Sequence, residues 1–159
     1  MMISKINSSK WAVLILMLSV FFAASSCKKE SDVEKQAAID RALIDQYVAD
    51  HNLDGQYTAN GNYYVILEHG NGNYPYPSAV IQVTYKGYLL DGTVFDEGYI
   101  AATRLSSLIL GWQDGIRRID VGGRIKLIIP SRYAYGTMET DNIPANSVLV
   151  FDITLHDFE

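Results

Sequence analysis

The sequence predicts an α+β domain in which a mostly antiparallel β-sheet wraps around one short helix. Segments of alternating apolar and polar residues, separated by turn residues, recur from residue 63 to the C-terminus. Eleven tyrosines favour β structure and a pocket with aromatic walls. Between two strand-like segments lies one short helical pattern, at 108–116. An isolated helix of this length is unstable in water, so we expect the sheet to hold it.

The helical segment carries a tryptophan and contains two glycines, Gly111 and Gly115. Trp112, Ile116 and Ile119 are spaced i, i+4 and i+7, which places them on one face of a helix. The opposite face is polar and comprises Gln113, Asp114, Arg117 and Arg118. We therefore expect Trp112 to face the concave side of the sheet.

Length and composition indicate one globular domain with an N-terminal appendage. The 159 residues, 48% of them hydrophobic, suffice for one core and are few for two. With 13 Lys and Arg against 18 Asp and Glu, the net charge is -5, and no basic patch suggests a nucleic-acid partner. The single cysteine excludes an internal disulfide.

Residues 1–26 have the pattern of a lipoprotein signal peptide. Lys5 and Lys10 precede an apolar run at 11–24, which is shorter than the ~20 residues that a membrane-spanning helix needs. The segment 24–27, Ala-Ser-Ser-Cys, resembles a bacterial lipobox, although Ala stands where Leu is usual. Cys27 would then be lipidated and would hold the protein at the outer membrane, on its periplasmic or surface face. The alternative is a free cysteine within an ordinary signal peptide.

Residues 27–62 are expected to form a tether, an amphipathic helix and a connector. A charged tether at 28–32 leads to a helical pattern at 33–50, with Asp32 as a candidate N-cap. This helix could pack on the domain, pair with a second copy or space the domain from the membrane. Its predicted apolar stripe consists of Ile39, Leu43, Tyr47 and Val48.

Strands are predicted in order from residue 63. The segments 63–67 and 79–90 read as strands, and Asp91-Gly92 is a tight-turn signal before a further strand at 93–96. Residues 97–107 are expected to form a loop. On the second strand, the inner face is predicted to carry Ile81, Val83 and Tyr85.

The remainder of the chain supplies two more strands. Gly122-Gly123 leads into a strand at 124–129, which Pro130 ends. A loop at 131–147 precedes the last strand, whose polar residues alternate with apolar ones. The inner face of that strand is predicted to carry Leu149, Phe151, Ile153 and Leu155.

Eight short blocks between residues 63 and 158 stand out together. They are Val83-Thr84-Tyr85-Lys86-Gly87, Leu90-Asp91-Gly92-Thr93-Val94-Phe95-Asp96, Ile109-Leu110-Gly111-Trp112, Val121-Gly122-Gly123, Ile129-Pro130, Ala134-Tyr135-Gly136, Ile143-Pro144 and Leu149-Val150-Phe151-Asp152. Their order and approximate spacing resemble those of the FKBP family, peptidyl-prolyl isomerases that bind macrolide immunosuppressants. The resemblance implies an FKBP-type isomerase domain at 63–159, with the sheet shaped as a half-barrel.

The resemblance implies a proline pocket and assigns its residues. Trp112 would be the floor, the main-chain N–H of Ile109 and the hydroxyl of Tyr135 would bind substrate carbonyls, and Asp96 would be a polar partner at the rim. Leu108 and Ile143 would contact substrate. The apolar walls would be Tyr85, Phe95 and Phe151.

The implied activity is prolyl cis/trans isomerisation of extracytoplasmic, proline-containing polypeptides, with macrolides such as tacrolimus as further ligands. No cofactor is implied. His51, His69 and His156 are far apart and lack the spacing of metal ligands, so no metal site is expected. The alternative function is a non-catalytic chaperone or peptide-binding lipoprotein that keeps the fold.

The chain departs from the family pattern at two positions near the expected pocket. Ala102-Thr103-Arg104 stands where related members have an aromatic residue, so we expect one pocket wall to be missing unless another side chain such as Tyr99 supplies it. Leu110 stands where many members have proline. A wetter pocket with weakened macrolide binding is the expected consequence of the threonine at position 103.

Overall fold

The computed structural model describes residues 31–159, within which residues 32–159 form one compact unit. The predicted signal peptide and Cys27 lie outside the described residues. No helix in the described part of the chain is long and apolar enough to cross a membrane.

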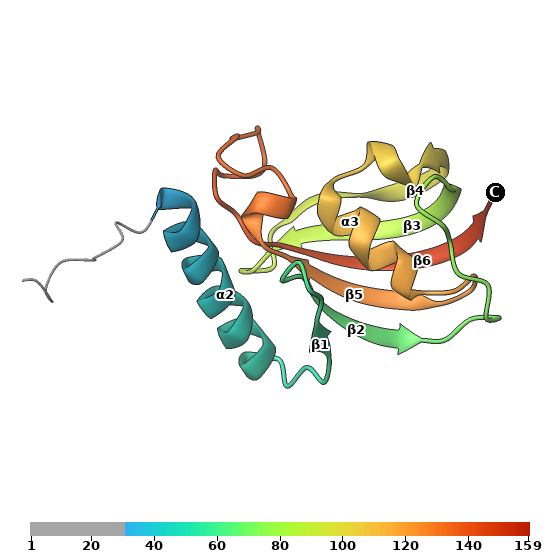
Figure 1. Ribbon diagram of the computed structural model, residues 1–159, viewed down its shortest axis with the longest axis horizontal. Helices are drawn as coiled ribbons and strands as arrows, with labels where there is room; N and C mark the ends of the chain where they lie inside the picture. The colour runs from blue at the N-terminus through green and yellow to red at the C-terminus, as the bar shows by residue number, and fades with distance from the viewer. Residues whose placement is uncertain (1–30) are drawn as a thin grey trace, which may run out of the picture. The chain divides into compact units, whose positions relative to one another are not determined.

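The unit is built on one six-stranded sheet in which every strand pairing is antiparallel, as predicted (Figure 1). The strand order is β1-β2-β5-β6-β3-β4, so β5, β6 and β3 lie in the middle and β4 at an edge. The strands are β1 (Gln56–Tyr57), β2 (Tyr63–Glu68), β3 (Val80–Leu89), β4 (Val94–Arg104), β5 (Arg124–Ile129) and β6 (Leu149–Phe158). The helices are α2 (Asp32–Asp50), α3 (Leu110–Gly115) and the short 3-10 turns η2 (Leu105–Ser107), η3 (Ile116–Arg118) and η4 (Ser131–Tyr133).

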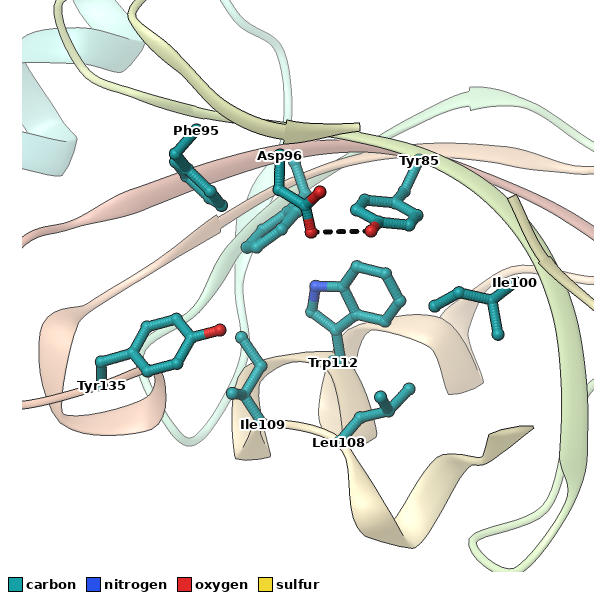
Figure 2. Close-up of a pocket in the computed structure, with 9 residues that line it drawn as sticks. Tyr85, Phe95, Asp96, Ile100, Leu108, Ile109, Trp112 and Tyr135 are labelled. Atoms are coloured by element: carbon teal, nitrogen blue, oxygen red, sulfur yellow. Dashed lines mark hydrogen bonds between the residues drawn. The ribbon is translucent and has the colours of Figure 1, made fainter. Parts of the chain in front are cut away.

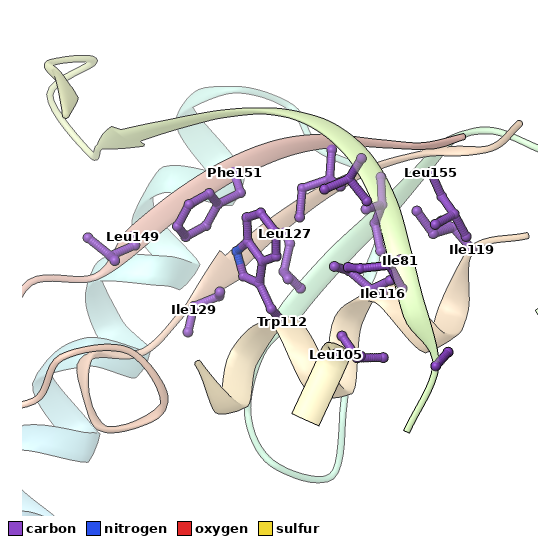
Figure 3. Packing of buried hydrophobic residues seen from close by; sticks show 14 of the residues in the cluster. Ile81, Leu105, Trp112, Ile116, Ile119, Leu127, Ile129, Leu149, Phe151 and Leu155 are labelled. Atoms are coloured by element: carbon purple, nitrogen blue, oxygen red, sulfur yellow. The ribbon is translucent and has the colours of Figure 1, made fainter. Parts of the chain in front are cut away.

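The main core lies between the sheet and α3. Trp112, Ile116 and Ile119 are each at most 4% exposed, which confirms the predicted apolar face of the helical segment (Figure 3). The alternating residues predicted to face inward on β3 and β6 pack against them. Fully or nearly fully buried in this cluster are Ile81, Val83, Leu105, Ile125, Leu127, Ile129, Leu149, Phe151, Ile153 and Leu155.

Two glycines let α3 lie directly on β5. A Cβ atom at Gly111 would be 2.4 Å from Cγ2 of Ile129, and one at Gly115 would be 2.4 Å from Cδ2 of Leu127. Both distances are far below van der Waals contact, so any larger residue would push the helix off the sheet. The glycines four residues apart thus meet two same-face residues of one strand.

Helix α2 packs on the other face of the same sheet. Ile44 and Tyr47 form a second buried cluster with Ile128 of β5 and Val150 of β6. These strand residues alternate with the ones that face α3, because successive side chains of a strand point to opposite faces. Of the three roles considered for this helix, packing on the domain is therefore observed.

The predicted apolar stripe of α2 is half right, because Tyr47 and Val48 pack in the second cluster but Ile39 and Leu43 do not. The buried residues are Asp40, Ile44 and Tyr47, whereas Ile39 is 52% and Leu43 38% exposed. The stripe was predicted only in part because it includes a carboxylate. Asp40 can be buried since the backbone N–H and the hydroxyl of Ser131 donate to its Oδ2, at 2.8 and 2.7 Å, and the side-chain amide of Gln36 donates to its Oδ1 at 2.7 Å.

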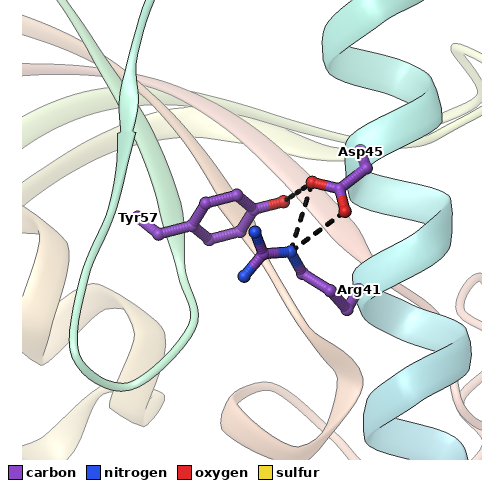
Figure 4. Close-up of polar contacts among 3 residues, drawn as sticks. All are labelled: Arg41, Asp45 and Tyr57. Atoms are coloured by element: carbon purple, nitrogen blue, oxygen red, sulfur yellow. Dashed lines mark hydrogen bonds and ion pairs between the residues drawn. The ribbon is translucent and has the colours of Figure 1, made fainter.

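A polar clamp attaches α2 to β1, a two-residue strand inside the predicted connector 52–62 (Figure 4). The hydroxyl of Tyr57 donates to Asp45 at 2.6 Å, and Nε of Arg41 donates to both Asp45 oxygens at 3.1 and 3.2 Å. The guanidinium also lies 3.5 Å from the centre of the Tyr57 ring. The hydrogen bond from Tyr57 is the main cause that lowers the pKa of Asp45, and burial is the main cause that raises the pKa of Tyr57.

The predicted loop at 97–107 is wrong, because β4 continues to Arg104 before η2 begins. Residues 97–100 and 103–104 pair with β3, and register shifts interrupt the pairing of β3 with β4 between Ile81 and Val83 and between Gly87 and Tyr88. An edge strand with most side chains exposed needs no regular apolar alternation, which is why its pattern was not recognised. The turn before it is as predicted: Gly92 has a φ of +87°, and Asp91 accepts a hydrogen bond from the N–H of Thr93.

We predict that two isoleucines on opposite faces of α2 contribute very differently to the free energy of unfolding. Ile44→Ala should lower the free energy of unfolding by ~2–5 kcal/mol, because it removes a buried side chain and leaves a cavity. Ile39→Ala, the same change on the exposed face, should alter it by less than about 0.5 kcal/mol. Urea denaturation of both variants measures the difference, and equal destabilisation would contradict the observed orientation of the helix.

Candidate active site

A pocket opens on the concave side of the sheet, above the N-terminal end of α3 (Figure 2). Its volume is about 130 Å³. An apolar cavity of roughly 150 Å³ holds one benzene ring, so this pocket suits a single small ring. Its lining comes from β3, β4, β6, the approach to α3, α3 itself and the loop after η4, and comprises Tyr85, Phe95, Asp96, Ile100, Leu108, Ile109, Trp112, Tyr135 and Phe151.

Aromatic rings packed edge to face form the base of the pocket. The ring of Trp112 lies 5.3 Å from that of Tyr85 and 5.2 Å from that of Phe151, with interplanar angles of 76° and 87°. Phe151 meets Phe95 in the same way at 5.5 Å. Such T-shaped contacts are favourable and fix ring orientation, so the pocket has rigid apolar walls before any ligand binds.

Gly87 of β3 makes room for these rings. A Cβ atom there would lie 2.6 Å from the Phe95 ring and 2.7 Å from the Phe151 ring. Phe95 is the extra residue of a bulge, because Asp96 pairs with Gly87 and Val94 pairs with Tyr88. Because of the bulge, the consecutive residues Phe95 and Asp96 both line the pocket, which two successive residues of a regular strand would not do.

The polar groups of the pocket lie at its rim. The hydroxyl of Tyr85 donates to Oδ2 of Asp96 at 2.7 Å. Burial, helped by the hydrogen bond to Asp96, raises the pKa of Tyr85 to about 12. Tyr85 therefore stays protonated and continues to donate at any pH well below 12. The hydroxyl of Tyr135 points into the pocket from the opposite side (Figure 2).

Ile109 brings a backbone donor to the same pocket. It is the N-cap of α3 in an extended conformation, and its carbonyl accepts the N–H groups of Trp112 and Gln113. Its own N–H has no hydrogen-bond partner within residues 31–159. Helix N-termini leave such groups unsatisfied, so this N–H can donate to an acceptor on a bound molecule.

All but one of the residues predicted for the pocket line it. The exception is Ile143, which is 6% exposed, packs into the main core and borders a separate depression next to Leu89 and Val94. The indole nitrogen of Trp112 is buried without a hydrogen-bond partner in the described part of the chain, so this residue contributes ring surface. Within residues 31–159, no group of three His, Cys, Asp or Glu side chains is placed to hold a metal.

Ile100 lines the pocket and was missed from the sequence, because its segment was assigned to a loop. In the structure Ile100 pairs with Val83, an inner-face residue of β3, and this register cannot be read from the irregular sequence of β4. Thr103 pairs with Ile81 and does not line the pocket. Tyr99, the alternative wall, is 58% exposed and donates to Gln82 on the other side of the sheet.

Leu110, the second departure from the family pattern, is the first residue of α3 and is 56% exposed. Proline also suits the first position of a helix, where its missing N–H is not needed. Leu110 is not part of the pocket lining.

Comparison with known proteins agrees with this geometry. Residues 72–156, just over half of the chain, match the family described as FKBP-type peptidyl-prolyl cis-trans isomerase. The FKBP-type peptidyl-prolyl cis-trans isomerase FkpA of Escherichia coli is 36% identical over 146 residues, which cover 88% of this chain and 54% of that protein. FkpA of Buchnera aphidicola from Acyrthosiphon pisum is 44% identical over 104 residues, covering 63% of this chain and 43% of that protein. The chain thus spans about half the length of these relatives.

The fold of the chain is also similar to solved structures of peptidyl-prolyl cis-trans isomerases. The crystal structure of FkpA from Escherichia coli superposes with a TM-score of 0.68 at 32% identity, covering 98% of this chain and 75% of that one. A peptidyl-prolyl cis-trans isomerase from Pseudomonas syringae superposes with a TM-score of 0.70 at 28% identity, covering 82% of this chain and 98% of that one. With the sheet, the short helix and the sequence match in agreement, the chain belongs to the FKBP-type peptidyl-prolyl cis-trans isomerase family.

Proposed function

We propose that the protein is a prolyl cis/trans isomerase that acts on proline-containing polypeptides and assists the folding of extracytoplasmic proteins. The observation that carries this proposal is the rigid aromatic pocket of one-ring size, lined by Ile109, whose N–H is unpaired within residues 31–159, and by Tyr135, whose hydroxyl points into it. A prolyl ring would lie on Trp112, and the two donors would bind carbonyl oxygens on either side of it.

The chemistry requires no nucleophile, metal or cofactor. Resonance in the planar amide creates a rotation barrier of ~18–20 kcal/mol. Water favours the charge-separated resonance form, so a dry pocket weakens the double-bond character and stabilises the twisted amide relative to the planar one. Binding the twisted form better by roughly 5 kcal/mol would accelerate rotation by nearly four orders of magnitude.

Each polar group has a role in this mechanism. The donors at Ile109 and Tyr135 hold the substrate carbonyls in the orientation reached during rotation, and fixed donors in an apolar site do so without reorganisation. Asp96 is engaged by Tyr85, which keeps both groups at the rim and orients the ring of Tyr85 as a wall. The same apolar surface would bind macrolides such as tacrolimus.

A protease-coupled assay on a proline peptide tests the activity, with Tyr135→Phe as the diagnostic variant. We expect the wild type to accelerate isomerisation and Tyr135→Phe to lower kcat/KM about fivefold, the effect of losing one neutral hydrogen bond. The matched control is Tyr99→Phe, the same change on a tyrosine outside the pocket. Background turnover by the folded wild type would instead favour the non-catalytic, peptide-binding chaperone.

A second prediction assigns the pocket wall to Ile100. Ile100→Ala should lower both kcat/KM and tacrolimus affinity about fivefold, because a wall that excludes water is removed. Thr103→Ala, at the position where related members have an aromatic residue, should leave both within about twofold, since it lies outside the lining. The opposite ranking would show that the wall is assigned to the wrong residue.

The localisation proposal rests on the sequence of the N-terminus. Cys27 follows an apolar segment and a lipobox-like pattern, so we expect it to carry a lipid that anchors the protein to the outer membrane of the cell envelope. Cys27→Ala should leave the precursor unprocessed or release the protein from the membrane fraction, as followed by fractionation and mass spectrometry. A variant that matures and stays membrane-bound would place the anchor elsewhere.

A further inference from the structure

The geometry points to Asp40 of α2 as a positioning residue for Tyr135, so that a helix outside the matched segment 72–156 helps to build the active site. This inference rests on the proposed function. Asp40 does not touch the pocket, and its effect would be transmitted through Ser131.

Asp40 is a fully buried carboxylate whose stabilisation comes from hydrogen bonds. Its side chain is 0% exposed, and none of the ion pairs in the described part of the chain includes it. The backbone N–H and the hydroxyl of Ser131 both donate to one oxygen, and Gln36 donates to the other. A buried charge is costly unless such donors surround it, so the position of Ser131 relative to α2 is strongly constrained.

Ser131 in turn organises the turn that carries Tyr135. Its carbonyl accepts the N–H of Ala134 at 2.9 Å and the N–H of Gly136 at 2.8 Å. These two residues flank Tyr135 directly. One serine thus has its N–H and hydroxyl fixed by α2, while its carbonyl fixes the backbone on both sides of the pocket tyrosine.

The same turn is hydrogen-bonded to the loop that follows it. The carbonyl of Tyr135 accepts the N–H of Met138 at 3.1 Å, and the carbonyl of Gly136 accepts the N–H of Asn146 at 2.7 Å. The side chain of Tyr135 extends from this turn into the pocket (Figure 2). Displacement of the turn by a fraction of an ångström would therefore misplace the hydroxyl relative to its substrate carbonyl, which catalysis tolerates poorly.

Two other contacts dock α2 without involving this turn. Ile44 and Tyr47 pack on the outer face of the sheet, and the clamp of Arg41, Asp45 and Tyr57 joins the helix to β1 (Figure 4). Loss of the Asp40 interaction can therefore be separated from loss of helix docking. Tyr57→Phe is the matched control, because it removes a hydrogen bond between α2 and the sheet but none to residues 131–136.

The test compares variants of the full chain in the proline-peptide assay. Asp40→Ala should lower kcat/KM about fivefold, Asp40→Asn should retain most of the activity because it still accepts from Ser131, and Tyr57→Phe should stay within about twofold of wild type. In a Tyr135→Phe background, Asp40→Ala should cause little further loss, since the group it positions is already absent.

Full activity of Asp40→Ala would overturn the inference. So would a fivefold loss of kcat/KM on adding Asp40→Ala to the Tyr135→Phe background, or a fivefold loss in Tyr57→Phe alone. If Asp40→Ala does not fold, Ser131→Ala, which removes only the hydroxyl donor, takes its place in the same comparison.

Amide hydrogen exchange separates this inference from the proposed function. Asp40→Ala should speed exchange at Gly136 while leaving Ile129 in the core protected, whether or not the wild type has turnover. Unchanged exchange at Gly136 would overturn the positioning role. A wild type without turnover, but with this exchange pattern, would contradict the proposed activity and leave the role of Asp40 intact.

Discussion

The structure depends on the direct contact between α3 and β5. Gly111 and Gly115 let the helix backbone rest on Ile129 and Leu127, where any Cβ atom would approach within 2.4 Å of a side-chain carbon. A helix of six residues has no stability of its own, so this contact decides whether it forms. It also sets the depth at which Trp112 lies and places the N-cap residue, Ile109, in the pocket lining. Close packing of α3 on the sheet therefore positions the floor of the site.

The central strands β5 and β6 contribute buried side chains to the clusters on both faces of the sheet. Leu127 and Phe151 face α3, whereas Ile128 and Val150 face α2, so β5 is continuously apolar over 127–129 and β6 over 149–151. This arrangement fixes the two helices relative to one another through the same few strand residues. A helix that begins 40 residues before the family match is thus an integral part of the folded unit, and its buried carboxylate reaches the turn that carries Tyr135.

The elements that could be predicted from the sequence are those with a regular pattern of apolar residues. Strong period-two alternation predicted β3, β5 and β6, and i, i+4, i+7 spacing predicted the buried face around Trp112. The stripe of α2 was predicted only in part, because apolar patterning cannot foresee a buried aspartate that accepts two hydrogen bonds from a serine 91 residues away. Most of β4 and the pocket residue Ile100 were missed because an edge strand with a bulge shows no regular alternation. The family resemblance predicted most of the pocket residues. The contribution of α2 to the site could be inferred only from the three-dimensional contacts.

The most direct test of the account is whether a prolyl ring occupies the surface of Trp112. The indole N–H of Trp112 has no hydrogen-bond partner in the described part of the chain, so its NMR resonance reports on the pocket. Titration with a proline peptide should shift this resonance saturably, while a matched peptide with alanine in place of proline should leave it nearly unmoved. No shift with the proline peptide, or equal shifts with both peptides, would contradict the claim that this pocket recognises proline.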